Sequence, residues 1–181
     1  MMDQLHRAIA QQNWEQAAEI LRPLCMGKIV HPSLLYNFGK VLIEQQTWAE
    51  AVVILTRTVA IAHENANAWF ELGRAHLGCD DLPAAAKAFQ RALELVPSDD
   101  DARRNLGRIL LRLGHWLEAK CVWEPLKGDA EADLAIYRLA AETKDPTART
   151  LREGLLQSHP NRAAVIQTLC RVSKGAIPLR L

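Results

Sequence analysis

Apolar side chains recur along the chain at the spacing of three and four residues that is typical of amphipathic helices. Residues 66–99 contain two such sets: Trp69, Leu72 and Leu77, then Ala85, Phe89, Ala92 and Leu93. Between the sets, Asp81 can cap a second helix and Pro83 suits its first turn. Ser98 and Asp101 resemble a weak capping box for the helix that follows. The pattern predicts consecutive helices, and no stretch of the sequence sustains the period of two that a strand requires.

Four columns of residues return at one interval of 34 positions. They are Gly39, Gly73 and Gly107; Ala17, Ala51, Ala85 and Ala119; Trp14, Trp48, Leu82 and Trp116; and Leu21, Leu55, Phe89 and Trp123. Four columns with one period indicate a repeat array. Glycine within a helix costs about 1 kcal/mol relative to alanine, so its recurrence indicates a close approach between helices. We expect Gly73 to lie opposite Ala85, with larger residues such as Phe89 at the flanks.

Residues 66–99 closely resemble a tetratricopeptide repeat (TPR). The matching positions, with histidine in place of the family's usual tyrosine at one of them, are Trp69, Leu72, Gly73, His76, Ala85, Phe89, Ala92 and Pro97. Residues 32–65 and 100–133 resemble the repeat more loosely, and residues 1–31 resemble a repeat with a shortened first helix. Residues 134–160 resemble a degenerate repeat.

The register of the repeat drifts within residues 134–160. Three positions of the second helix fit the pattern if about five residues are missing between the helices: Ala148, Leu155 and Pro160. We expect Asp145 to cap this helix and Pro146 to begin it. Residues 161–174 are predicted to form a capping helix that covers the end of the array, followed by a tail over residues 175–181.

The resemblance implies an all-α fold, a right-handed superhelical solenoid of antiparallel helix pairs that forms a single TPR-like domain over residues 1–181 with a C-terminal capping helix. It also implies an inner groove, lined by the first helix of each pair, that receives a peptide or a helix of a partner protein.

Helical spacing places the fifth, ninth and twelfth positions of each repeat on this inner surface. They are Tyr36, Lys40 and Ile43; Phe70, Arg74 and Leu77; and Arg104, Arg108 and Leu111, with Asn67 and Arg112 beside them. The ninth position is basic in three successive repeats, and His6 is its counterpart in the first. The candidate peptide-binding residues are Tyr36, Lys40, Asn67, Phe70, Arg74, Arg104, Arg108 and Arg112. In the alternative interpretation this surface is solvated, the aromatic residues pack against the neighbouring repeat and the arginines pair with acidic residues across it. The apolar members Ile43, Leu77 and Leu111 are interpreted as packing between repeats and not as ligand contacts.

Charge does little to narrow the class of partner. Lys and Arg total 22 against 21 Asp and Glu, so the net charge of +1 gives no overall indication of a polyanionic partner or an anionic membrane. Some TPR modules hold a C-terminal carboxylate with Lys, Asn and Arg residues of three first helices. The corresponding places here hold Tyr36, Lys40, Glu71, Asp101 and Asn105, so that set is not reproduced.

Motifs for catalysis, metal or cofactor binding are missing from the sequence. It contains no HExxH, no glycine-rich phosphate loop and no closely spaced Cys/His ligand set, so we expect no enzyme activity, no metal and no cofactor. The four cysteines form no CxxC pair, and each is interpreted as a small hydrophobic residue. Without a signal-peptide pattern or an apolar run of about 18 residues, we expect a cytoplasmic protein that does not enter membranes.

The leading hypothesis is a non-enzymatic scaffold or adaptor that binds a protein or peptide in its groove, with the basic positions suited to an acidic partner. A second is a TPR interaction or dimerisation module of a larger enzyme such as a glycosyltransferase, suggested by the apolar tail KGAIPLRL. Homo-oligomerisation stays open. Recognition of RNA is disfavoured because Glu44, Glu71 and Asp101 lie near the groove, so no nucleic-acid partner is expected.

Overall fold

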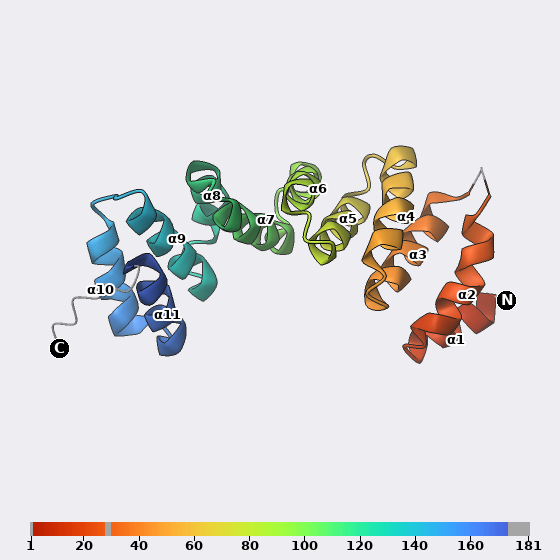
Figure 1. The fold of residues 1–181 in the computed structure, drawn as a ribbon, viewed down its shortest axis with the longest axis horizontal. Coiled ribbons are helices and arrows are strands. Elements are labelled where there is room, and N and C mark those ends of the chain that lie inside the picture. Colours follow the sequence, from red (N-terminus) through yellow and green to blue (C-terminus); the bar gives the residue numbers. More distant parts are fainter. Residues whose placement is uncertain (1, 28–29, 174–181) are drawn as a thin grey trace. The chain divides into compact units, whose positions relative to one another are not determined.

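The computed structural model describes residues 2–27 and 30–173, and in these residues the chain forms helices and no extended sheet (Figure 1). They belong to two compact units, residues 1–102 and 103–181. The α-helices are α1 (Met2–Ala10), α2 (Trp14–Cys25), α3 (Pro32–Glu44), α4 (Trp48–Ile61), α5 (Ala66–Gly78), α6 (Leu82–Leu95), α7 (Asp100–Leu113), α8 (Trp116–Trp123), α9 (Ala130–Glu142), α10 (Ala148–Ser158) and α11 (Arg162–Ser173). A short 3₁₀ helix, Glu124–Leu126, follows α8. The predicted all-α fold of helix pairs is confirmed; the single domain over the whole chain stays a prediction.

The turns within the helix pairs repeat with the same period as the sequence. One residue of each turn has a positive φ, and four of these residues are 34 positions apart: Gln12, Gln46, Asp80 and Gly114. The second helix then begins two residues later, at the column that holds Trp14, Trp48, Leu82 and Trp116. At α6 the Asp81 carboxylate accepts a hydrogen bond from the Ala84 amide at 3.1 Å, with Pro83 in the first turn, as predicted.

The recurring glycines lie against the large residues of the second helix. A Cβ added at Gly73 would come within 2.8 Å of the Phe89 ring, whereas Ala85 is not among its nearest neighbours. The same holds in the neighbouring pairs, where Gly39 faces Leu55 and Gly107 faces Trp123, each at 2.5 Å. The residue that the sequence placed at the flank of Gly73, Phe89, is therefore the one nearest to it, and each of these glycines leaves room for a large side chain of the second helix.

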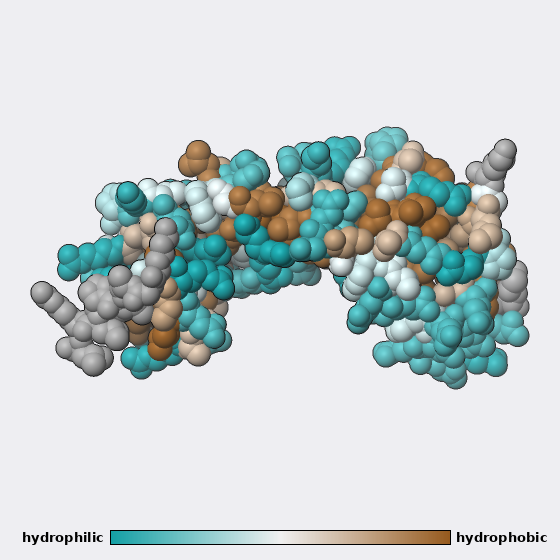
Figure 2. All heavy atoms as spheres, viewed as in Figure 1, coloured by the Kyte–Doolittle hydropathy of each residue, from teal (hydrophilic) through white to brown (hydrophobic). Residues whose placement is uncertain are grey.

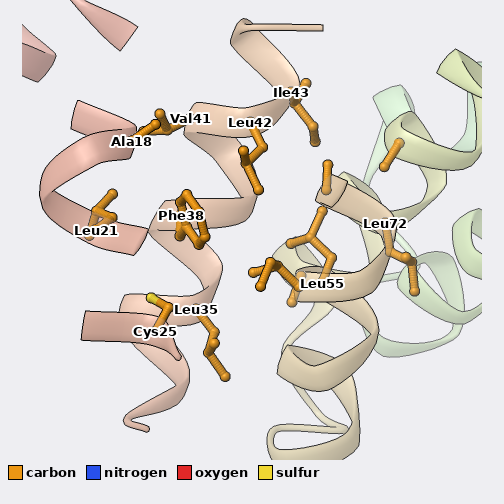
Figure 3. Close-up of a cluster of buried hydrophobic side chains, with 14 of the residues drawn as sticks. Ala18, Leu21, Cys25, Leu35, Phe38, Val41, Leu42, Ile43, Leu55 and Leu72 are labelled. Carbon is orange, nitrogen blue, oxygen red and sulfur yellow. The ribbon is translucent and has the colours of Figure 1, made fainter. Parts of the chain in front are cut away.

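In the first unit, successive helices bury one continuous apolar core. Figure 3 shows Leu21 of α2 and Phe38 of α3 between these two helices, and Leu42 of α3 on the side of that helix nearer Leu55; all three are at most 1% exposed. Leu55 from α4 and Leu72 from α5 extend the same cluster. Helix α3 thus packs on α4 of its own pair and on α2 of the preceding pair, and α5 packs in the same way on α6 and α4, as a repeat array requires.

The second unit departs from the regular repeat. Helix α8 is only eight residues long and passes into the 3₁₀ helix, where Pro125 interrupts the α-helical hydrogen bonding. As a result α9 begins 30 residues after α7 instead of 34. The missing residues therefore fall before α9, not between α9 and α10 as the sequence suggested. Tyr137, which is buried, takes the place of the recurring glycine.

Two predicted helix starts are also corrected. The cap of α7 is Asp99, whose carboxylate accepts from the Ala102 amide at 2.9 Å, in place of the proposed capping box at Ser98 and Asp101. Helix α10 begins at Ala148 with Thr147 as its N-cap. Asp145 accepts hydrogen bonds from both the amide and the hydroxyl of Thr147, so it orders the turn before the helix and Pro146 lies outside it.

The predicted capping helix is present as α11. Its Val165 packs with Tyr137 of α9 and Leu155 of α10 in a small apolar cluster at the end of the second unit. The tail that follows lies outside the described residues.

Surface polarity varies between helices. Figure 2 shows apolar surface over α4, where Val53 and Ile61 are more than half exposed, and hydrophilic surface over α1 and α2. Of the four cysteines, Cys25 is buried and Cys79, Cys121 and Cys170 are exposed. Among the described residues no helix is long and apolar enough to span a bilayer, and no cluster of three metal-ligating side chains occurs.

The glycine contact gives a direct test of packing. Gly73→Ala should improve intrinsic helix propensity by about 1 kcal/mol, yet we expect a net loss of roughly 1–3 kcal/mol in the free energy of unfolding because the new methyl group would collide with Phe89. The matched control is Gly154→Ala in α10, where an added Cβ meets nothing within 4 Å. The control should be neutral or stabilising in urea denaturation. Equal stabilisation by both changes would contradict the proposed contact.

Candidate functional site

Tyr36 and Lys40 lie next to each other on the predicted surface of the first unit. Both lie on α3, and the Lys40 Nζ sits 5.7 Å from the centroid of the Tyr36 ring, within the range of a cation–π interaction. Burial, and then the carboxylate of Glu71, raise the pKa of the Tyr36 phenol. Lys40 is exposed, and in the described part of the chain it forms no ion pair. This surface therefore offers a cation and a half-buried aromatic ring side by side.

Arg74 on α5 is held by two carboxylates. Its guanidinium donates to Glu71 at 2.9 Å and lies 3.5 Å from Glu44 of α3. Glu71 is only 7% exposed, so removing its cation would leave a carboxylate in a place of low polarity. The pairing of arginine with acidic residues, which the alternative interpretation anticipated, is present at this position. Arg74 joins neighbouring first helices and adds little net positive charge to the surface.

Two further predicted residues of the first unit differ in accessibility. Asn67 is exposed on the first turn of α5. Phe70 is partly buried, and its ring meets Phe89 edge to face with 5.4 Å between centroids. Phe70 thus packs within its own helix pair, and only part of its ring remains for a ligand.

In the second unit the predicted residues Arg104, Arg108 and Arg112 follow one another along α7. Arg108 donates from Nε and Nη2 to the two oxygens of Glu131 on α9, both at 2.6 Å, and from Nη1 to Asn105 at 3.2 Å. Arg104 lies 3.6 Å from Asp129, the N-cap of α9. These contacts hold α9 against α7 and offset part of the positive charge.

A pocket of about 290 Å³, called the arginine pocket below, lies within the second unit. Its charged or aromatic lining residues include Arg108 and Arg112 of α7, Trp123 of α8, Glu131 and Arg138 of α9, and Arg171 of α11. Burial, and then the guanidinium of Arg171, lower the pKa of Arg138. Arg138 also donates from Nη2 to the Leu111 carbonyl at 3.4 Å and lies over the Trp116 ring at 5.7 Å from its centroid. Among these lining residues, Arg138 and Arg171 form no ion pair with a carboxylate in the described part of the chain.

Arg138 and Arg171 were not among the residues predicted from the sequence. Arg138 nevertheless occupies the basic ninth position of its repeat: it follows Tyr137 as Arg108 follows Gly107, and it lies 30 residues after Arg108, as α9 lies 30 residues after α7. The signal was hidden because the comparison at a fixed interval of 34 points to Glu142 instead. Arg171 has no counterpart in the repeats, so no column could have revealed it.

The apolar residues of the predicted surface contribute to packing, as expected. Ile43 and Leu111 are buried, and Leu77 is partly buried. The eight predicted residues fall into two groups, five in the first unit and three in the second. Their role in binding stays a prediction.

Comparison with known proteins agrees with the repeat architecture. Residues 66–109 match the family model described as tetratricopeptide repeat. Superkiller protein 3 of Saccharomyces cerevisiae is 24% identical over 127 residues, which is 67% of this chain and 9% of that protein. The chain thus spans less than a tenth of the length of this relative.

Solved structures share the fold at low sequence identity. YrrB, described as a TPR protein with an unusual peptide-binding site, is similar with a TM-score of 0.78 and 18% identity, covering 90% of this chain and 87% of its own. MamA is similar with a TM-score of 0.72 and 19% identity, covering 99% and 93%. Together with the helix pairs and their 34-residue period, these matches show that the chain has the tetratricopeptide repeat fold, with the family pattern itself matched over residues 66–109.

Proposed function

We propose that the chain is a non-enzymatic interaction scaffold in the cytoplasm that binds a peptide or a helix of a partner protein on the surface of its first helices. Its fold supports protein–protein interaction in general, and the peptide-binding site named for YrrB makes a peptide a reasonable ligand for this fold. The observation that carries the proposal is the pair of Tyr36 and Lys40: an exposed cation without a carboxylate partner in the described chain, stacked on an aromatic ring that could bury an apolar group.

The chemistry of the bound segment follows from this pair. An aromatic face and a cation together suit a peptide with an apolar side chain next to an acidic one. Asn67, exposed on the neighbouring first helix, can donate to and accept from a peptide backbone. An affinity in the micromolar range, about 8 kcal/mol, would be ordinary for such a site.

Charge reversal at Lys40 tests the binding surface. Peptides would be selected on the full chain from a random display library, and their dissociation constants measured by fluorescence anisotropy. Lys40→Glu should raise Kd about tenfold or more because it replaces attraction by repulsion at the peptide. The matched control, Lys87→Glu, makes the same charge change at an exposed position of α6, a second helix, and should change Kd less than about twofold. Failure to enrich any peptide, or equal effects of the two variants, would reject the proposal.

Arg74 should respond differently, since it is part of the structure of the surface. Arg74→Glu would place a third carboxylate beside Glu44 and Glu71, and we expect the free energy of unfolding to fall by roughly 1–3 kcal/mol. Urea denaturation measures this loss, and Lys40→Glu, which breaks no ion pair, should leave the midpoint nearly unchanged. An unchanged midpoint for Arg74→Glu would show that its ion pairs do not stabilise the helix packing.

A further inference from the structure

The arginine pocket holds more positive charge than the protein around it neutralises. Arg108 is matched by the bidentate contact with Glu131. Arg138 and Arg171 have no carboxylate within ion-pair distance in the described part of the chain, although both line the pocket. Arginine stays protonated, so two guanidinium groups this close repel each other unless an anion joins them.

Two buried N–H groups add a second, independent observation. The indole Nε1 of Trp123 and the Nε of Arg138 are both buried and have no hydrogen-bond acceptor in the structure. Buried donors of this kind nearly always have a partner, and leaving one without an acceptor costs about 1–3 kcal/mol. Both residues line the arginine pocket. Two residues that line the pocket therefore each hold a buried N–H group without an acceptor, beside the positive charge of Arg138 and Arg171.

The size of the pocket limits what could supply these oxygens. A volume of about 290 Å³ is at the lower end of small-molecule sites, too small for a large cofactor and sufficient for one charged group with its linking atoms. Guanidinium groups bind planar carboxylates and phosphoryl groups through paired N–H donors. Both groups carry acceptor oxygens and negative charge, which Arg138 and Arg171 do not receive from Glu131 because its two oxygens accept from Arg108.

We propose that the arginine pocket is an oxyanion subsite that takes the side-chain carboxylate or phosphoryl group of a bound peptide, with Arg138 and Arg171 as its principal ligands. The identity of the carrier as a peptide rests on the proposed function; the presence of an oxyanion site does not. Glu131 binds Arg108 and so keeps that side of the pocket from attracting a second anion.

Nuclear magnetic resonance of the full chain can observe the pocket donors directly. The protein would be labelled with ¹⁵N and titrated separately with inorganic phosphate and with sodium acetate, each against sodium chloride at equal ionic strength. We expect the indole signal of Trp123 and the Nε signal of Arg138 to shift and saturate with at least one oxyanion and not with chloride. The probe that binds more tightly indicates which side chain of a peptide the pocket takes. Tighter binding of phosphate indicates a phosphorylated residue, and tighter binding of acetate indicates an acidic residue.

Variants then assign the site. Arg171→Gln removes an exposed cation and should raise Kd for the tighter probe about fivefold or more. Arg138→Gln removes the other proposed ligand and should raise Kd by a similar factor. The control, Arg149→Gln on α10, removes the same charge from a side chain that is 82% exposed and paired with Glu153, outside the pocket. It should leave Kd within about twofold.

The outcomes separate this proposal from the proposed function. Shifts that do not saturate, or that match those caused by chloride, would overturn the subsite, as would equal losses for Arg171→Gln and Arg149→Gln. In that case, selected peptides whose affinity depends on Lys40 would still support peptide binding on the surface of the first helices. Conversely, if anions bind saturably but no peptide is selected, the oxyanion site is supported and the proposed peptide-binding function is rejected.

Discussion

The close approach of a glycine in one helix to a large side chain in the next is the contact on which the rest of the structure depends. In three successive pairs, Leu55, Phe89 and Trp123 fill the space that a Cβ of the facing glycine would need. This contact fixes which side of each first helix is buried. The side chain of the residue after the glycine is rotated by about 100° around the helix axis, away from the contact. Lys40, Arg74 and Arg108 all occupy that position, so one packing rule places the basic residues of the candidate surface.

Electrostatic pairing then divides these basic residues into two kinds. Arg74 and Arg108 reach acidic residues of a neighbouring first helix, Glu44 and Glu131, and join consecutive repeats. Lys40 in the first unit and Arg138 in the second have the same position in their repeats but no carboxylate at ion-pair distance among the described residues. The charge available for a ligand therefore comes from the positions where the neighbouring helix supplies no acid.

The irregular fifth repeat creates the most distinctive feature of the second unit. Pro125 ends α8 early, α9 is displaced by four positions along the sequence, and Tyr137 replaces the glycine that allows close packing elsewhere. The basic residue after this position is retained as Arg138. With Arg171 of the capping helix it lines the arginine pocket, so departure from the repeat and the appearance of a charged cavity occur together.

The 34-residue period predicted the helix pairs, while residue type and amphipathic spacing predicted the cap at Asp81 and the final helix. All of these depend on residue spacing and on short-range hydrogen bonds. The partner of each glycine, the acids that neutralise Arg74 and Arg108, and the arginine pocket could not be read in the same way. They join residues on different helices, and a helical pattern states which face is buried but not which side chain lies across from it. Sequence spacing thus determined the elements of this protein, whereas the distances between side chains of separate helices, set only when the helices pack, decided which charges remain for a ligand.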